Sequence, residues 1–121
     1  MFRFEKLGVW QKSIDFGNDV YIATQAFPAR EQYGLTSQLR RAAVSISSNL
    51  AEGSSRASNK DFSRFVEIAY GSLCECVSLL RFARMQSFID NKQHDALYRA
   101  TDELARMLSA FRSSLGDWIP E

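Results

Sequence analysis

Few side chains in this sequence could take part in chemistry, and they are scattered: a single histidine, His94, and two cysteines, Cys74 and Cys76. A catalytic histidine needs a partner placed to exchange a proton with it, and spacing places no serine, cysteine or carboxylate in that role. The polar neighbours of His94 indicate a surface histidine near the start of a helix. Glycine-rich phosphate loops, GxSxG turns and HExxH helices are missing from the sequence. We therefore expect no catalytic, cofactor-binding or metal-binding residue.

The two cysteines lie two positions apart in a helical pattern, so their side chains diverge by roughly 200°. They cannot readily pair with each other. Cys76 falls on an apolar stripe and is expected in the core, whereas Cys74 is expected to be exposed. A metal site needs further cysteine or histidine ligands, which the chain does not offer.

Polar residues beside the expected core form the next group of interest. Glu75 lies at or next to an apolar stripe, and a buried carboxylate must be paired or neutralised. Arg40 or Arg41 is the expected partner. We favour a structural network that fixes helix register or a subunit contact, and the alternative is acid–base catalysis by Glu52 or Glu75 with an arginine. The residues assigned to this network are Arg41, Asn49, Glu52 and Glu75.

A mild local excess of basic residues extends from Arg40 to Arg84. With a formal net charge of +1, the chain has no broad basic footprint, which weighs against strong duplex binding. A solvated helix face explains such an excess. The alternative is contact with a nucleic acid or a partner protein, and the candidate contact residues are Arg40, Arg41, Arg56, Lys60 and Arg64.

The elements that must position these side chains are helices. The 121 residues suffice for one domain with a real core, and 45% hydrophobic with 24% charged residues is ordinary for a globular protein. Apolar residues recur at helical spacing, and no segment alternates as a strand does. We predict a single domain over residues 1–121 with helices at about 9–26, 35–52, 59–87 and 91–115. Short connections between them predict an all-α, up-down-up-down antiparallel four-helix bundle.

Local signals mark where these helices start and stop. Pro28 ends the first helix. Gly53 is expected to end the second in the left-handed conformation. Ser58 and Asp90 each precede an acidic or amide residue by three positions, which predicts capping boxes. Gly71 lies inside the third helix at a cost of about 1 kcal/mol relative to alanine, so a close helix crossing is expected there.

Each helix carries an apolar stripe. The stripe of the second helix is Leu35, Leu39, Ala42, Ile46 and Leu50, that of the third is Phe62, Phe65, Val66, Ala69, Leu73, Cys76, Leu80 and Ala83, and that of the fourth is Leu97, Ala100, Leu104, Met107 and Phe111, extended by Leu115 and Trp118. The first helix has two adjacent stripes, Val9, Phe16, Val20, Ala23 and Trp10, Ile14, Gly17, Tyr21. This face is wider than one core needs, which indicates a subunit contact. We therefore expect a homo-oligomer.

No apolar run approaches the roughly 20 residues of a membrane helix. The first residues also lack the apolar core and cleavage site of a signal peptide. We therefore expect a cytoplasmic protein with no membrane partner and no small-molecule substrate.

Five segments together resemble one known family, the four-helix-bundle proteins encoded in intervening sequences of bacterial 23S rRNA genes. The match covers nearly the whole chain in order, through LGVWQK at 7–12, FPAREQYGL at 27–35, QLRRAAVSI at 38–46, NLAEG at 49–53 and GSLCE at 71–75. The resemblance implies a small bundle that assembles into a ring-shaped homopentamer without established enzymatic activity. It also implies a relation to the accessory proteins of diversity-generating retroelements, pentameric bundles associated with nucleic acid and a reverse transcriptase.

Overall fold

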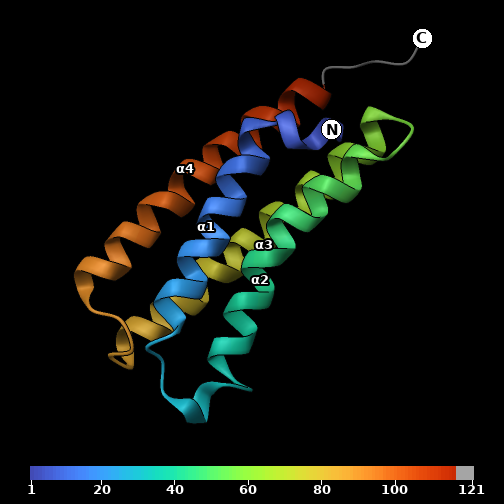
Figure 1. Ribbon diagram of the computed structural model, residues 1–121. Coiled ribbons are helices and arrows are strands. Elements are labelled where there is room, and N and C mark those ends of the chain that lie inside the picture. The colour runs from blue at the N-terminus through green and yellow to red at the C-terminus, as the bar shows by residue number, and fades with distance from the viewer. Residues whose placement is uncertain (117–121) are drawn as a thin grey trace.

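The computed structural model describes residues 1–116 (Figure 1). These residues form two short 3₁₀ helices, η1 (Arg3–Lys6) and η2 (Ala29–Glu31), and the long helices α1 (Gly8–Thr24), α2 (Leu35–Ser54), α3 (Asn59–Met85) and α4 (Asn91–Gly116). Each long helix runs opposite to the one before it. α1 and α3 each contact both α2 and α4, so the helices pack as a four-cornered bundle. The predicted all-α up-down-up-down bundle is confirmed.

The helix bounds lie close to the predicted ones, and the differences have local causes. α1 ends at Thr24, because the chain must reach an extended conformation before Pro28. α3 ends at Met85, and Ser87 follows in the left-handed region at φ 62°. Trp118, which the fourth stripe includes, lies outside the described residues.

Side chains cap the two later helices, but the predicted reciprocal capping box is formed only at Asp90, and at Ser58 only the serine hydroxyl takes part. Ser58 Oγ accepts a hydrogen bond from the Asp61 amide at 3.1 Å. Asp90 Oδ1 accepts from the Gln93 amide at 2.7 Å, and Gln93 Oε1 accepts from the Asp90 amide at 2.9 Å. This reciprocal pair satisfies amide groups that the first turn of α4 leaves without helical partners.

The core lies along the bundle axis and is built from the predicted stripes with one shift. Leu39, Ile46 and Leu73 are fully buried. On α4 the buried line passes through Thr101 and Leu108, while Ala100, Met107 and Phe111 pack at its edge. The buried face of α4 is therefore rotated toward Thr101 and Leu108 relative to the predicted one. Thr101 tolerates this burial because its hydroxyl donates to the Tyr98 carbonyl at 2.6 Å.

His94 is buried, so the prediction of a surface histidine is wrong. Its residue exposure is 5%, its ring stacks on Tyr98 with centroids 6.1 Å apart, and Nδ1 lies 3.4 Å from Asp95 Oδ1. Positions 94, 97 and 101 share one helix face, and that face points inward. The charged neighbours of His94 obscured this periodicity.

Gly53 does not end α2, so the prediction of a left-handed helix end is wrong. It is buried within the last turn, and no glycine among the described residues has a positive φ. A Cβ at Gly53 would lie 2.6 Å from Phe65 Cβ and 2.8 Å from Phe62 Cδ1. Glycine is required here because α3 passes too close for any side chain.

Gly71 shows the opposite situation. It is exposed in the middle of α3, and a Cβ there would meet nothing within 4 Å. The close helix crossing predicted at this position is therefore not made inside the subunit.

Within the described part of the chain, none of the helices combines the length and the apolarity that crossing a bilayer requires.

The two glycine environments predict opposite effects of alanine. Gly53→Ala should lower the free energy of unfolding by roughly 1–3 kcal/mol, because the new methyl group overpacks the Phe62 and Phe65 contact. Gly17→Ala is the control, since Gly17 is helical with nothing within 4 Å of a Cβ, and it should raise stability by up to about 1 kcal/mol. Urea denaturation of both variants measures the difference, and equal effects would contradict the steric assignment.

Candidate interaction surfaces

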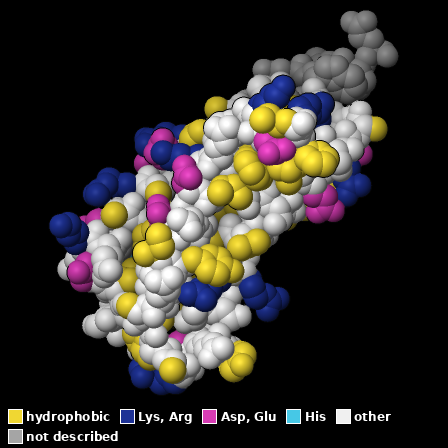
Figure 2. All heavy atoms as spheres, viewed as in Figure 1, with side chains coloured by type: hydrophobic (Ala, Val, Ile, Leu, Met, Phe, Trp, Pro, Cys, Tyr) yellow, Lys and Arg dark blue, Asp and Glu magenta, His cyan; other side chains and the backbone are white. Residues whose placement is uncertain are grey.

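An apolar strip runs along the outer side of α1 and α2. Ile14 and Tyr21 of α1 and Val44 of α2 are 43%, 42% and 43% exposed, and we call these residues the α1–α2 strip. Figure 2 shows hydrophobic side chains in a band over these two helices. Trp10, the fourth large residue of this side, is half-buried against Phe4, with ring centroids 5.1 Å apart. The second stripe of α1 is therefore only partly covered by the subunit itself.

Arg40 is held by α1 and does not extend into solvent as a free cation. Its guanidinium lies 4.5 Å from the centroid of the Tyr21 ring. Its Nε donates to Thr24 Oγ1 at 2.7 Å, and a terminal nitrogen donates to the Tyr21 carbonyl at 3.3 Å. These contacts fasten α1 to α2, so Arg40 has a structural role within the bundle.

Arg56, Lys60 and Arg64 lie at the other end of α2, around the α2–α3 turn. Arg56 pairs with Glu52 at 3.2 Å and lies 4.6 Å from the centroid of the Phe65 ring. Arg64 lies 3.8 Å from Asp61. Lys60 and Arg64 line a hollow of about 620 Å³ together with one acid, Glu67. The other lining residues are Ser58, Ser63, Leu115 and Gly116.

The five basic candidates therefore form two groups in one subunit. Arg41 lies 13 positions before Ser54, the last residue of α2, which corresponds to roughly 20 Å along the helix axis, and Arg56 lies beyond that end. Two of the five, Arg56 and Arg64, have acidic partners. A single continuous basic patch is not present on the described subunit.

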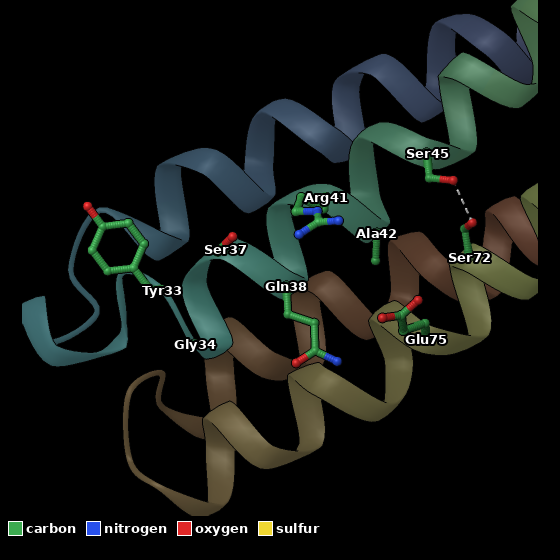
Figure 3. A pocket seen from close by; sticks show the side chains of 9 residues that line it. All are labelled: Tyr33, Gly34, Ser37, Gln38, Arg41, Ala42, Ser45, Ser72 and Glu75. Atoms are coloured by element: carbon green, nitrogen blue, oxygen red, sulfur yellow. Dashed lines mark hydrogen bonds between the residues drawn. The ribbon is translucent and has the colours of Figure 1, made fainter.

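A polar hollow of about 520 Å³ lies between the first half of α2 and the middle of α3 (Figure 3). Its sides carry Arg41 from α2 and Glu75 from α3. Ser45 and Ser72 join the two helices at one end by a 2.8 Å hydroxyl hydrogen bond. The remaining lining residues are Tyr33, Gly34, Ser37, Gln38 and Ala42.

The hydrogen bonds do not join Arg41, Asn49, Glu52 and Glu75 into one network. Asn49 Nδ2 donates to the Ser45 carbonyl and hydroxyl oxygens at 2.8 and 2.9 Å. The Ser45 hydroxyl is in turn hydrogen-bonded to the Ser72 hydroxyl. The spacing of charged residues does not predict this contact, and the only signal for it is that both residues are small and polar. Glu52 belongs instead to the ion pair with Arg56.

The ion pair predicted between Glu75 and Arg40 or Arg41 is not formed. Arg40 turns toward α1, and neither Arg41 nor Glu75 belongs to a salt bridge within residues 1–116. The reason for the error is burial: Glu75 is exposed, so water solvates its charge and no partner is needed. Among the described residues, no group of histidine, cysteine and acidic side chains is arranged to hold a metal ion.

Comparison with protein families matches residues 5–110 to the family described as 23S rRNA-intervening sequence protein. The chain belongs to this family. The fold is shared with a crystal structure at 1.70 Å resolution described as a protein of unknown function from the S23 ribosomal protein family of Bacteroides thetaiotaomicron. That match has a TM-score of 0.77 and 21% identity, and it covers 86% of this chain and 97% of the other. The search of curated proteins finds no match.

The cysteines next to Glu75 differ in reactivity by their burial. Burial, and secondarily the charge of Glu75, raises the pKa of the Cys76 thiol from 9.0 to about 12, whereas Cys74 is exposed. One thiol of the folded protein should therefore react rapidly with an aromatic disulfide reagent at pH 8, and Cys74→Ser should abolish that fast phase. Retention of the fast phase in Cys74→Ser would contradict this assignment.

The same shift predicts a pH dependence of stability. Folding keeps Cys76 protonated, whereas the thiol of the unfolded chain ionises near its ordinary pKa of 9.0. Its contribution is therefore complete below pH 9 and is lost as the pH rises toward 12. The stability advantage of the wild type over Cys76→Ala should decrease across this interval in denaturant titrations, and a constant advantage would show that the thiol does not remain protonated.

Proposed function

We propose that this member of the 23S rRNA-intervening sequence protein family is a non-catalytic helix bundle that assembles with copies of itself through the α1–α2 strip. The exposure of Ile14, Tyr21 and Val44 is the observation that carries the proposal. Large apolar side chains gathered on one side of a folded subunit are typical of a protein contact. The ring-shaped homopentamer implied by the family resemblance is one closed arrangement that would cover it.

A non-catalytic role fits the placement of the reactive side chains. His94 and Cys76 are buried, and neither lines the polar hollow that holds Arg41 and Glu75. Arg41 and Glu75 do share that hollow, but neither has a histidine, cysteine or second acid beside it in the lining. The groups that acid–base or nucleophilic catalysis would bring together are therefore dispersed in the described residues.

A second copy of the chain is the favoured occupant of the strip. The strip residues themselves carry no charge, and the Arg40 guanidinium against Tyr21 already has hydrogen-bond partners on α1. Identical subunits commonly close such faces by cyclic symmetry. The alternative is an adaptor that uses the same strip for a different protein.

Charged substitutions in the strip test self-assembly. Ile14→Lys and Val44→Lys should each raise the dissociation constant of the assembly at least tenfold, because each places a charge in a buried apolar contact. Ile22→Lys is the matched control, since Ile22 is 56% exposed on the same helix as Ile14 but off the strip, and its assembly should be unchanged. Light scattering over a concentration series measures the mass.

A wild-type protein that remains a folded monomer at low micromolar concentration would overturn the proposal. The adaptor alternative predicts that the chain captures a different protein. That capture should survive nuclease treatment and should be lost in Ile14→Lys.

A second candidate is contact with RNA or DNA through Arg40, Arg41, Arg56, Lys60 and Arg64. The observation that favours it is the hollow at the α2–α3 turn, where Lys60 and Arg64 stand beside two serines that can donate to phosphate oxygens. Repetition around an assembly would add avidity to weak contacts. The relation to retroelement accessory proteins remains a prediction from the resemblance.

Salt dependence tests this candidate. Binding of a structured RNA should weaken steeply between about 50 and 200 mM salt, in proportion to the number of phosphates contacted. Lys60→Ala with Arg64→Ala should weaken binding and flatten that dependence, whereas Lys92→Ala, an exposed lysine at the start of α4, should not. Binding that is absent or indifferent to salt would reject the candidate.

A further inference from the structure

The polar hollow between α2 and α3 carries two opposite charges that the subunit leaves without ion-pair partners. We propose that a second copy of this chain docks on this face about a twofold axis running along the hollow, so that Arg41 of each copy pairs with Glu75 of the other. We call Arg41, Ser45, Gly71, Ser72 and Glu75 the α2–α3 face. The inference rests on the self-assembly proposed above and identifies an additional contact.

The charges make this face complementary to itself. Arg41 stands on α2 and Glu75 on α3, on opposite sides of one hollow (Figure 3), and neither forms a salt bridge within residues 1–116. A twofold axis parallel to the helices exchanges the two sides, which places α2 of each copy opposite α3 of the other. Both arginines then meet a glutamate, and two equivalent ion pairs form across one contact.

The small side chains of the face allow close approach. Ala42, Ser45 and Ser72 line the hollow, and Gly71 lies four positions before Glu75, on the same face of α3. A Cβ at Gly71 would meet nothing within 4 Å, so packing within the subunit gives no reason for glycine at a position where alanine would favour the helix. A neighbouring helix lying over Gly71 supplies that reason.

Apolar residues extend the same side of α3 beyond the charges. Ile68 precedes Ser72 by four positions and Phe82 follows Glu75 by seven, which are spacings that keep residues on one helix face. Both are more than half exposed, at 51% and 56%. Phe and Arg are among the residues enriched in protein contacts, whereas a site for a small polar ligand does not need exposed apolar residues beside it.

The contact is distinct from the α1–α2 strip. The two surfaces meet on the outer side of α2, where Arg41 and Val44 are three positions apart and are therefore neighbours. They differ in their second helix, which is α1 for the strip and α3 for this face, so substitutions of Ile14 and Glu75 report on them separately. Their loss should therefore have separable effects on the mass of the assembly.

Charge reversal and mixing test the pairing directly. Arg41→Glu alone should bring glutamate against Glu75, and Glu75→Arg alone should bring arginine against Arg41, so each variant should lose this contact with at least a tenfold rise in dissociation constant. An equimolar mixture should regain it, because one copy then carries two acids and the other two bases. The double variant R41E/E75R should regain it as well.

The two single reversals, their mixture, the double variant and the unreversed protein are all made in the Ile14→Lys background, which weakens the strip contact. Circular dichroism verifies that each is folded. The proposal expects a dimer for the unreversed background, monomers for each single reversal, and dimers for the mixture and the double variant. Monomers throughout would overturn the α2–α3 contact without bearing on the strip, which Ile14→Lys tests by itself. Rescue in the double variant but not in the mixture would also overturn it, since the pairing would then lie within one subunit.

Steric substitutions at Gly71 give an independent measurement. Gly71→Ala should preserve the dimer or weaken it less than Gly71→Leu, which should abolish it. Ala110→Leu, at an exposed position of α4, is the control for adding an exposed leucine and should leave the dimer intact. Equal dimerisation of Gly71→Leu and Ala110→Leu would contradict the close approach.

Discussion

The contact of Gly53 with Phe62 and Phe65 sets how closely α2 and α3 can lie, and much of the structure follows from it. The chain turns within a few residues after Gly53 and returns along α2, so the first turns of α3 lie directly against the last turn of α2. This places Phe62 in the core, next to Phe111 of α4 with ring centroids 5.2 Å apart. The same pairing of α2 with α3 brings Ser45 to Ser72 and shapes the hollow that holds Arg41 and Glu75. A wider separation of α2 and α3 at the turn would remove the Ser45–Ser72 hydrogen bond and change the shape of the hollow.

The helices and their caps could be predicted because they depend on neighbours in sequence. The Ser58 and Asp90 caps need only residues three positions away, and the apolar stripes report the local period of the helix. The errors fall where the outcome depends on a distant segment. Gly53 at a helix end is typical of a left-handed cap, and only the position of α3 shows that it is a packing glycine.

The surface residues were the least predictable, because charge and spacing do not report which neighbour a flexible side chain selects. Arg40 and Arg41 are adjacent in sequence, yet Arg40 is held by Tyr21 and Thr24 while Arg41 lines an exposed hollow. Adjacent side chains point about 100° apart around the axis of α2, so Arg40 meets α1 whereas Arg41 lies toward α3. The sequence places Glu75 beside the apolar stripe of Cys76, but the same rotation carries it outward and leaves Cys76 in the core.

The proposed pairing of Arg41 with Glu75 between copies has a consequence for how many copies an assembly contains. A twofold contact uses the same surface on both subunits and therefore joins subunits two at a time. A head-to-tail contact uses two different surfaces and can close a ring of any size. A single ring with an odd number of subunits would leave every one of these hollows open toward solvent. Saturating both contacts therefore requires an even total, which a ring of odd size reaches by stacking on a second ring of the same kind.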